Sequence, residues 1–311
     1  GGAITVDTEV ASIDAATSAA GAIGITGVDA VTLTTVSTND GPITVNAGGT
    51  VTATSVDSSN TDADTNDIAI TVTADGSNIE VGTITTGGTD GDVVLTANDA
   101  GTQAVVDSTS SITADDLEIT TRSGIGVSGT PINTAVNTAN LSTTVDGGIY
   151  VNETGGITLT DVDTVIGAVE VTATGGVSAT DVTTGDGPIT IDAGGLVTAT
   201  LVDASATDAE ANDISITTSA GNIAVTEVLG GAGQANDVTL DAAGAITDAS
   251  GVATGITGEV LTADAGGAIT VDTEVASIDA ATSAPGAIDI TEVDAVTLTT
   301  VSTSDGPITV N

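Results

Sequence analysis

The feature that most limits how this chain can fold is its internal repetition. Residues 1–46 and 266–311 match at an offset of 265, and 42 of the 46 aligned pairs are identical. The four differences are Ala20/Pro285, Gly24/Asp289, Gly27/Glu292 and Asn39/Ser304. A fold for these 311 residues must accept nearly the same segment twice, which favours repeated units that stack on one another.

A weaker repeat lies inside the first 265 residues. The run Asp40 to Val45 recurs as Asp186 to Ile191, and again as Asp305 to Val310. We therefore expect one continuous solenoid over residues 1–311. Its parts are a super-repeat over 1–265, with half-units at about 1–145 and 146–265, and the start of the next super-repeat at 266–311.

The finest repeat is a strand motif, in which a turn containing Gly or Asp precedes an apolar–x–apolar triplet. Alternation of this kind places two side chains inward and the middle one outward. Successive motifs are 19 to 32 residues apart, and irregular spacing is allowed because insertions become loops. The motifs begin at Ile4, Ile23, Ile43, Ile68, Val93, Leu117, Ile149, Val169, Ile189, Ile214, Val238, Ile269, Ile288 and Ile308.

The composition suits a thin core. The chain has no Phe, Trp, Met or Cys and a single Tyr, so its apolar residues are almost all Val, Ile, Ala and Leu. Small and β-branched side chains fill the space between stacked strands, whereas compact cores draw on aromatics. We predict an all-β fold, a parallel β-helix (β-solenoid) of irregular 19–32-residue coils. A string of immunoglobulin-like sandwiches is the alternative, but a 19–20-residue repeat is too short for one.

Two stretches carry a resemblance to a known family. Gly41 to Val51 and Gly155 to Thr160 resemble the Gly-Ile-Thr-Leu/Val repeats of filamentous haemagglutinin-type exoproteins and other giant bacterial surface proteins. The resemblance covers nearly the whole chain. It implies a right-handed parallel β-helix and a secreted adhesin or filament.

The charge limits the partners and the location. With 43 acidic residues against one basic residue, the net charge is −42, which opposes binding to nucleic acid and to anionic membranes. Salt or divalent cations outside the cell would screen this repulsion. No apolar run reaches the length of a membrane-spanning helix. We expect an extracellular or cell-surface protein without a membrane-spanning segment.

The residues needed for catalysis are scarce. The chain has no His, Cys or Lys, and Arg122 is its only cation, so acid–base or nucleophilic chemistry would rest on carboxylates, hydroxyls and one phenol. A paired-carboxylate hydrolase stays open, although the aromatic platforms that usually hold sugars are missing. We predict that the protein is not an enzyme.

Two acidic insertions give the sharpest local signal. The first runs from Asp57 to Asp67 and the second from Asp203 to Asp213, and both keep the order Asp-x-acid-x-Asn-Asp. Acids at alternate positions suit calcium, which takes six to eight oxygen ligands. The candidate ligands, with calcium as the candidate cofactor, are Asp62, Asp64, Asp67, Asp208, Glu210 and Asp213. The competing interpretation is a solvated acidic loop that ends in an Asn-Asp turn.

The sequence thus predicts a structural role, as an extracellular fibre or the stalk of a giant adhesin. Its partners would be further copies of itself, head to tail, as covalent repeats or filament subunits. The alternative is an adhesin or binding module that recognises a cell-surface or glycan partner through side loops, with or without calcium. The non-repeated stretches Arg122–Asn140 and Gly230–Asn236 are the candidate loops.

Overall fold

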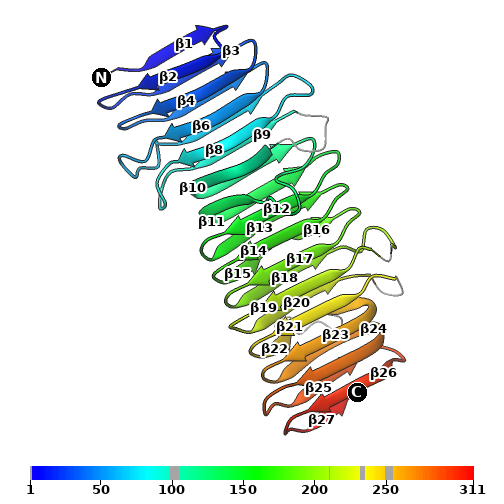
Figure 1. Cartoon of the computed structure of the whole chain (residues 1–311). Helices are drawn as coiled ribbons and strands as arrows, with labels where there is room; N and C mark the ends of the chain where they lie inside the picture. The colour runs from blue at the N-terminus through cyan, green and yellow to red at the C-terminus, as the bar shows by residue number, and fades with distance from the viewer. Residues whose placement is uncertain (1, 99–104, 210, 232–234, 249–254) are drawn as a thin grey trace. The chain divides into compact units, whose positions relative to one another are not determined.

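The computed structural model describes residues 2–98, 105–209, 211–231, 235–248 and 255–311. Throughout this described part the regular elements are β-strands, stacked in parallel as a β-solenoid of about 14 turns (Figure 1). The predicted all-β fold of stacked parallel strands is therefore confirmed. Over the same residues the chain forms no helix long and apolar enough to cross a membrane.

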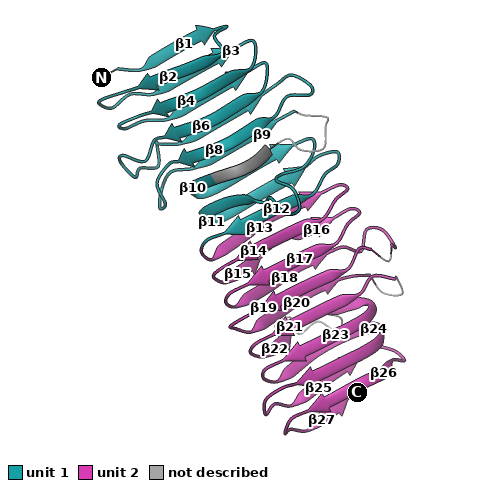
Figure 2. Cartoon of the chain, in the orientation of Figure 1, with its two compact units in different colours: residues 1–154 teal, residues 155–311 magenta. Residues whose placement is uncertain are grey.

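The chain divides into two compact units, residues 1–154 and 155–311 (Figure 2). Unit 1 contains β1 (Ile4–Thr8), β2 (Ser12–Ala16), β3 (Ile23–Gly27), β4 (Val31–Ser37), β5 (Ile43–Ala47), β6 (Val51–Asp57), β7 (Ile68–Val72), β8 (Ile79–Thr85), β9 (Val93–Ala97), β10 (Val105–Thr121), β11 (Ile132–Thr143) and β12 (Ile149–Glu153). Unit 2 contains β13 (Ile157–Thr164), β14 (Val169–Ala173), β15 (Val177–Ala179), β16 (Val182–Thr184), β17 (Ile189–Ala193), β18 (Val197–Asp203), β19 (Ile214–Thr218), β20 (Ile223–Leu229), β21 (Val238–Ala242), β22 (Ile246–Asp248), β23 (Ile256–Ala265), β24 (Ile269–Thr282), β25 (Ile288–Glu292), β26 (Thr297–Thr303) and β27 (Ile308–Val310).

In unit 1 the strands form two columns, each strand pairing in register with the strand one coil further on. The five-residue strands β3, β5, β7 and β9 share one column, and the seven-residue strands β4, β6 and β8 share the other. Within β5 the side chains alternate between buried and exposed, with Ile43 and Val45 inside and Thr44 outside. The side-chain orientation predicted from the apolar–x–apolar motif is therefore confirmed in this strand. The short-strand column stacks Ile4, Ile23, Ile43, Ile68, Val93 and Leu117.

Unit 2 follows the same plan. β14, β17, β19 and β21 are five-residue strands stacked in one column, while β18 and β20 are seven-residue strands in the other. The first column aligns Val169, Ile189, Ile214, Val238, Leu261, Ile278 and Leu298. The second aligns Ile157, Val177, Val197, Ile223, Ile246, Ile269, Ile288 and Ile308.

These columns correct the predicted coil lengths. The spacing of 31 residues from Val238 to Ile269 is not one coil, because Val238 pairs with Leu261 and Ile269 pairs with Ile246. The 32-residue spacing from Leu117 to Ile149 fails in the same way: Leu117 pairs with Ala139, and Ile149 forms a bridge with Ile125. Paired residues lie from 17 apart (Leu261 and Ile278) to 28 apart (Val51 and Ile79).

Both exceptions occur where two long strands stack, and we call each of these pairs a seam. The seam of unit 1 is β10 on β11, and the seam of unit 2 is β23 on β24. A seam strand runs through both columns: β10 pairs with β8 along its first part and with β9 along its last. At the seam of unit 2 the five-residue segment Ile269–Thr273 stacks on β22, in the column that held the long strands. The two columns therefore exchange strand types there.

Each seam carries a buried glutamate. Glu153 pairs with Thr134 of β11, and its Oε2 accepts bonds from Thr134 Oγ1 at 2.7 Å and from the Val136 backbone N–H at 3.1 Å. Glu292, the last residue of β25, makes the same contacts with β24. It accepts bonds from Thr273 Oγ1 at 2.7 Å and from the Val275 N–H at 3.3 Å. A buried carboxylate is tolerated only when it is hydrogen-bonded. Here each carboxylate accepts bonds from a hydroxyl and a backbone N–H of the preceding coil.

The tight turns between columns need glycine. In the Asp186-Gly187-Pro188 turn Gly187 has a φ of 151°, and a Cβ there would lie 2.2 Å from the carbonyl oxygen of Gly167 one coil earlier. Gly194 follows a short strand, and its Cβ would lie 1.9 Å from the Thr174 oxygen. Glycine at these positions lets successive coils approach to the spacing of paired strands, about 4.8 Å.

Replacing Glu153 with Ala tests the role of the seam carboxylate. The Val136 N–H and the Thr134 hydroxyl would lose their acceptor in a buried position, so the free energy of unfolding should fall by about 2–4 kcal/mol. Urea unfolding followed by circular dichroism measures the change. Glu170→Ala removes the same charge from an exposed position and should shift the unfolding free energy by no more than about 0.5 kcal/mol. Equal losses in both variants would contradict a specific role for Glu153.

Candidate cation-binding cluster and the acidic insertions

The first acidic insertion is fastened by a buried asparagine. Asn66 is 0% exposed, and its Oδ1 accepts a bond from the Gly41 N–H at 2.7 Å. Its Nδ2 donates to Thr61 Oγ1 at 2.8 Å and to the Thr61 carbonyl. The hydroxyl of Ser58 donates in turn to the Asn66 carbonyl. This side chain closes the loop onto the solenoid just before Ile68 begins the next strand.

The second insertion is built in the same way. Asn212 is 1% exposed, and its Nδ2 donates to Thr207 Oγ1 at 2.6 Å and to Asp186 Oδ1 at 3.1 Å. The shared Asn-Asp ending, which the sequence offered as part of a calcium motif, therefore has a structural purpose. The asparagine holds the loop, and the aspartate after it lies at the start of the next strand.

The candidate calcium ligands bond to the neighbouring coil. Asp62 Oδ1 accepts from the Asp90 N–H at 3.2 Å, and its Oδ2 accepts from the Thr89 hydroxyl. Asp67 Oδ1 accepts from the Asp92 N–H at 3.2 Å. In unit 2, Asp208 accepts from the Ala235 N–H at 2.7 Å, and Asp213 from the Asp237 N–H at 2.9 Å.

Two candidate calcium ligands remain. Asp64 is exposed on its insertion, and Glu210 lies outside the described residues. Among the residues that the structure describes, none of the candidates belongs to a group of three acids close enough to share one ion. Calcium binding by the insertions stays a prediction.

The structure instead brings together three acids that the sequence did not single out. Ligand oxygens of Asp92, Asp115 and Asp116 lie within 4.8 Å of one another. They converge because Asp92 precedes β9, and Asp115 and Asp116 occupy the corresponding place in β10, which stacks on it. An alignment of the residue before each apolar motif could have found two of them, since Asp92 and Asp116 share that position with Asp67.

Two of these acids, Asp92 and Asp116, belong to a row of aspartates linked by hydrogen bonds from one coil to the next. The Asp92 N–H donates to Asp67, and the Asp116 N–H donates to Asp92 Oδ1 at 3.2 Å. Asn137 Nδ2 donates to Asp115 Oδ1 at 2.7 Å. Burial raises the pKa of Asp92, and repulsion from Asp116, Asp67 and Asp115 adds to the rise, while the bond from the Asp116 N–H opposes it. Carboxylate oxygens are ligands that calcium prefers, so this is the candidate cation-binding cluster.

Like charges also meet in unit 2. Burial raises the pKa of Asp161, with a hydrogen bond and repulsion from Asp163 adding to it. Burial and the charges of Asp163 and Asp203 raise the pKa of Asp181. The pKa of Asp264 is raised by burial and then by Asp241 and Asp279. Parallel in-register stacking places acids from successive coils on one line, which explains why the groups repel one another.

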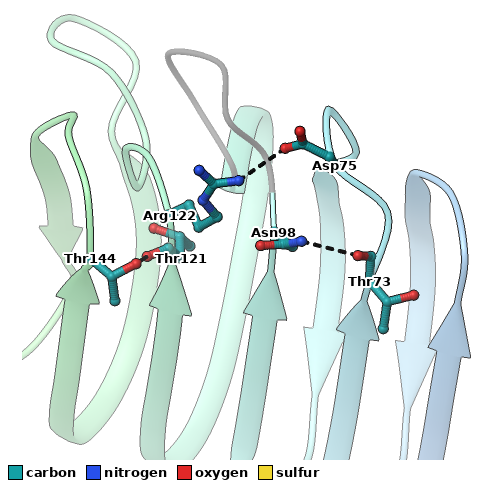
Figure 3. A network of polar contacts seen from close by, with 6 residues as sticks. All are labelled: Thr73, Asp75, Asn98, Thr121, Arg122 and Thr144. Carbon is teal, nitrogen blue, oxygen red and sulfur yellow. Dashed lines mark hydrogen bonds and ion pairs between the residues drawn. The ribbon is translucent and has the colours of Figure 1, made fainter.

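The single cation lies on the surface of unit 1. Arg122 Nη1 lies 3.0 Å from Asp75 Oδ1, beside bonds from Asn98 to Thr73 and from Thr144 to Thr121 (Figure 3). A cleft of about 360 Å³ opens next to this group, lined by Arg122 with Thr71, Thr96 and Thr120. An exposed pair of this kind contributes little to stability.

The structure corrects the prediction that Arg122–Asn140 forms a side loop. Residues from Ile132 onward form the seam strand β11, so about half of the stretch is part of the solenoid wall. Of Gly230–Asn236, residues 232–234 lie outside the described part. The buried Asn236 donates to the Gly230 carbonyl at 2.8 Å and so ties the two ends of that stretch together.

Comparison with known proteins identifies no relative: family models, curated proteins and solved structures all fail to match this chain. The structure is consistent with a β-helix repeat fold, whereas no family match supports the filamentous haemagglutinin-type assignment.

The Asp92→Asn variant tests the electrostatics of the cluster. A raised pKa means that the fold disfavours the charged carboxylate, a penalty that is complete above the folded pKa and vanishes below the ordinary value of 3.8. The variant should therefore melt higher than the parent at pH 7, by roughly a degree or two, and the difference should disappear as the pH falls below that value.

Thermal unfolding between pH 3 and 8 provides the measurement, and the same change at the exposed Asp146 is the control for net charge. Asn retains the oxygen that accepts from the Asp116 N–H, so the substitution isolates the charge. Identical pH profiles for Asp92→Asn and Asp146→Asn would show that the cluster carries no special repulsion.

Proposed function

We propose that the protein is a structural extracellular repeat protein that forms a fibre or the stalk of a giant adhesin. The observation that carries this proposal is the unbroken backbone pairing within each unit, where strand after strand binds in register to the next. Tension or shear along such a stack acts on many backbone bonds at once. A stacked architecture also extends by adding repeats without any change to the core.

The chemistry of the surface supports the same function. Outward positions carry Thr, Ser and acids, such as Thr44, Glu118 and Glu170, which keep the strands soluble. A net charge of −42 discourages lateral association between copies. The near absence of Lys and Arg also removes the cleavage sites of trypsin-like proteases, which suits a protein outside the cell.

A second candidate is an adhesin that recognises a partner through its surface, in a calcium-dependent manner. Two observations favour keeping it: the Asp92, Asp115 and Asp116 cluster, and the cleft beside Arg122. The fibre is preferred because the insertion carboxylates already bond to backbone groups of the neighbouring coil, which gives them a role without an ion.

Electron microscopy and fibre diffraction of the purified protein, with and without a calcium chelator, separate the two functions. The fibre predicts thin rods with a reflection near about 4.8 Å, unchanged by chelation because backbone pairing holds the coils. Rods that fall apart on chelation would support the calcium-dependent adhesin instead of the fibre. Beads on a flexible string would contradict both.

A further inference from the structure

Aspartate followed by glycine is the dipeptide of this chain most prone to a spontaneous backbone rearrangement. Glycine has no Cβ to block its nitrogen from reaching the aspartate side chain, and it adopts the turns that this approach requires. The rate therefore depends on how firmly the fold holds each dipeptide. The chain has no Asn-Gly and six Asp-Gly dipeptides: Asp40-Gly41, Asp75-Gly76, Asp90-Gly91, Asp146-Gly147, Asp186-Gly187 and Asp305-Gly306.

At five of these dipeptides the glycine is packed closely against other backbone atoms. A Cβ added to the glycine would come within 3.0 Å or less of a backbone atom elsewhere in the chain. Close packing of this kind restricts the rotation that brings the nitrogen and the side chain together. The shortest distances to backbone are 3.0 Å at Gly41, 2.6 Å at Gly91, and 2.2 Å at Gly147, Gly187 and Gly306.

Hydrogen bonds hold Asp40-Gly41 as well. The Gly41 N–H donates to Asn66 Oδ1 at 2.7 Å, and Asp40 Oδ1 accepts from the Thr61 hydroxyl at 3.0 Å. Both groups that would have to react are therefore engaged by the first acidic insertion. The insertion protects the Asp-Gly of the preceding coil while it fastens itself.

Asp75-Gly76 lies in the turn between β7 and β8 and differs in each of these respects. Gly76 is exposed with a φ of 76°, and no atom lies within 4 Å of its Cβ position. Within the described part of the chain, its N–H donates to no other group. The Asp75 side chain is 70% exposed, and its Oδ1 lies 3.0 Å from Arg122 Nη1 (Figure 3).

We propose that Asp75-Gly76 is the site at which the folded chain rearranges to isoaspartate, and that the ion pair with Arg122 slows this reaction. Solvent exposure and freedom from packing are concentrated at this one turn, whereas the other five glycines are packed. The modification goes beyond the proposed fibre function and does not depend on it.

The reaction needs no partner other than water. The backbone nitrogen of Gly76 attacks Cγ of Asp75, so that an N–Cγ bond forms and a Cγ–O bond breaks. The departing oxygen leaves as water with the amide proton and the carboxyl proton, which gives a five-membered succinimide. Water then opens the ring at Cγ, which restores aspartate, or at the main-chain carbonyl, which routes the backbone through Cγ as isoaspartate. The mass of the product equals that of the starting chain.

Arg122 acts on the first step. While Asp75 Oδ1 is bonded to the guanidinium, the carboxyl group is less free to turn toward the nitrogen of Gly76. An exposed ion pair opens readily, so it delays the attack and does not prevent it. Arg122→Gln removes the charge and keeps a polar side chain. It should raise the rate of isoaspartate formation at Asp75 roughly two- to fivefold, which is what an exposed pair can hold back.

The test compares two dipeptides within one peptide. A glutamate-specific protease cuts after Glu9 and Glu80, so that Asp40-Gly41 and Asp75-Gly76 both lie in the fragment of residues 10–80. The folded chain is stored for several weeks in mildly acidic buffer at body temperature. Electron-transfer fragmentation in the mass spectrometer then distinguishes isoaspartate from aspartate at each position. Isoaspartate should accumulate at Asp75 and stay near its starting level at Asp40.

The unfolded chain is the first control. In concentrated urea the contacts that distinguish the dipeptides are lost, so Asp40 and Asp75 should rearrange at similar rates. Asp75→Glu keeps the charge but would need a six-membered ring, which closes far more slowly, so this variant should lose most of the isoaspartate formed by the folded parent. Asp90→Glu makes the same change at another exposed aspartate of unit 1, and should form as much isoaspartate as the parent.

The site would be overturned if isoaspartate appeared in the folded chain at Asp40, or at any of the other four dipeptides, as fast as at Asp75. It would also be overturned if Asp75→Glu retained the isoaspartate of the parent. An unchanged or lower rate at Asp75 in Arg122→Gln would overturn the restraint by the ion pair.

Discussion

Hydrogen bonding between the backbones of successive coils is the constraint on which the rest of the structure depends. In a parallel stack every inward residue lies directly over an inward residue of the previous coil, so the core is a set of columns and not a centre. Ile43, Ile68 and Val93 occupy one such column, and Ile189, Ile214 and Val238 another. β-branched side chains suit this geometry because they pack well against copies of themselves on a pleated surface. Large aromatic rings would push the coils apart, which fits their near absence from the chain.

The same stacking decides where the negative charge goes. A repeat that puts an acid at one position puts acids in line along the column, as with Asp67, Asp92 and Asp116. The chain offsets part of this repulsion by using the carboxylates as acceptors for backbone N–H groups one coil further on. Where three acids meet, burial raises the pKa of Asp92, and repulsion from the neighbouring carboxylates raises it further despite the bond from the Asp116 N–H. The acidic surface is thus both a solubilising layer and a set of links between coils.

The strands could be predicted from the sequence because their signal is local: an apolar–x–apolar motif after a Gly or Asp turn states which side chains face inward. The column of a strand could not be predicted, because that depends on what lies beneath it. Ile269 has the same motif as Val238 but lies in the other column, on Ile246. The candidate site was likewise predictable only in part. Alternating acids indicated the insertions, whereas the role of the buried Asn66 in fastening one of them follows only from its contacts. The cluster of Asp92, Asp115 and Asp116 is made by stacking, so no single stretch of sequence displays it.

The few differences between the two near-copies bear on how a seam is formed. At the position of Glu292 the first copy has Gly27, and both pair with the same threonine, Thr273 in one copy and Thr8 in the other. With the glutamate present, the Val275 N–H is bonded to a buried carboxylate, and β24 continues through this point as one strand. With glycine, the Val10 N–H turns to Thr8 Oγ1 of its own segment at 3.0 Å, and the strand breaks into β1 and β2. Glu153 stands in the same relation to β11, a seam strand of unit 1. In β11 and β24 a backbone N–H at the corner, that of Val136 or Val275, is bonded to a glutamate carboxylate from the next coil, which supplies an acceptor there. One buried glutamate thus accompanies each seam, Glu153 in unit 1 and Glu292 in unit 2, although neither stands out in a sequence with 43 acids.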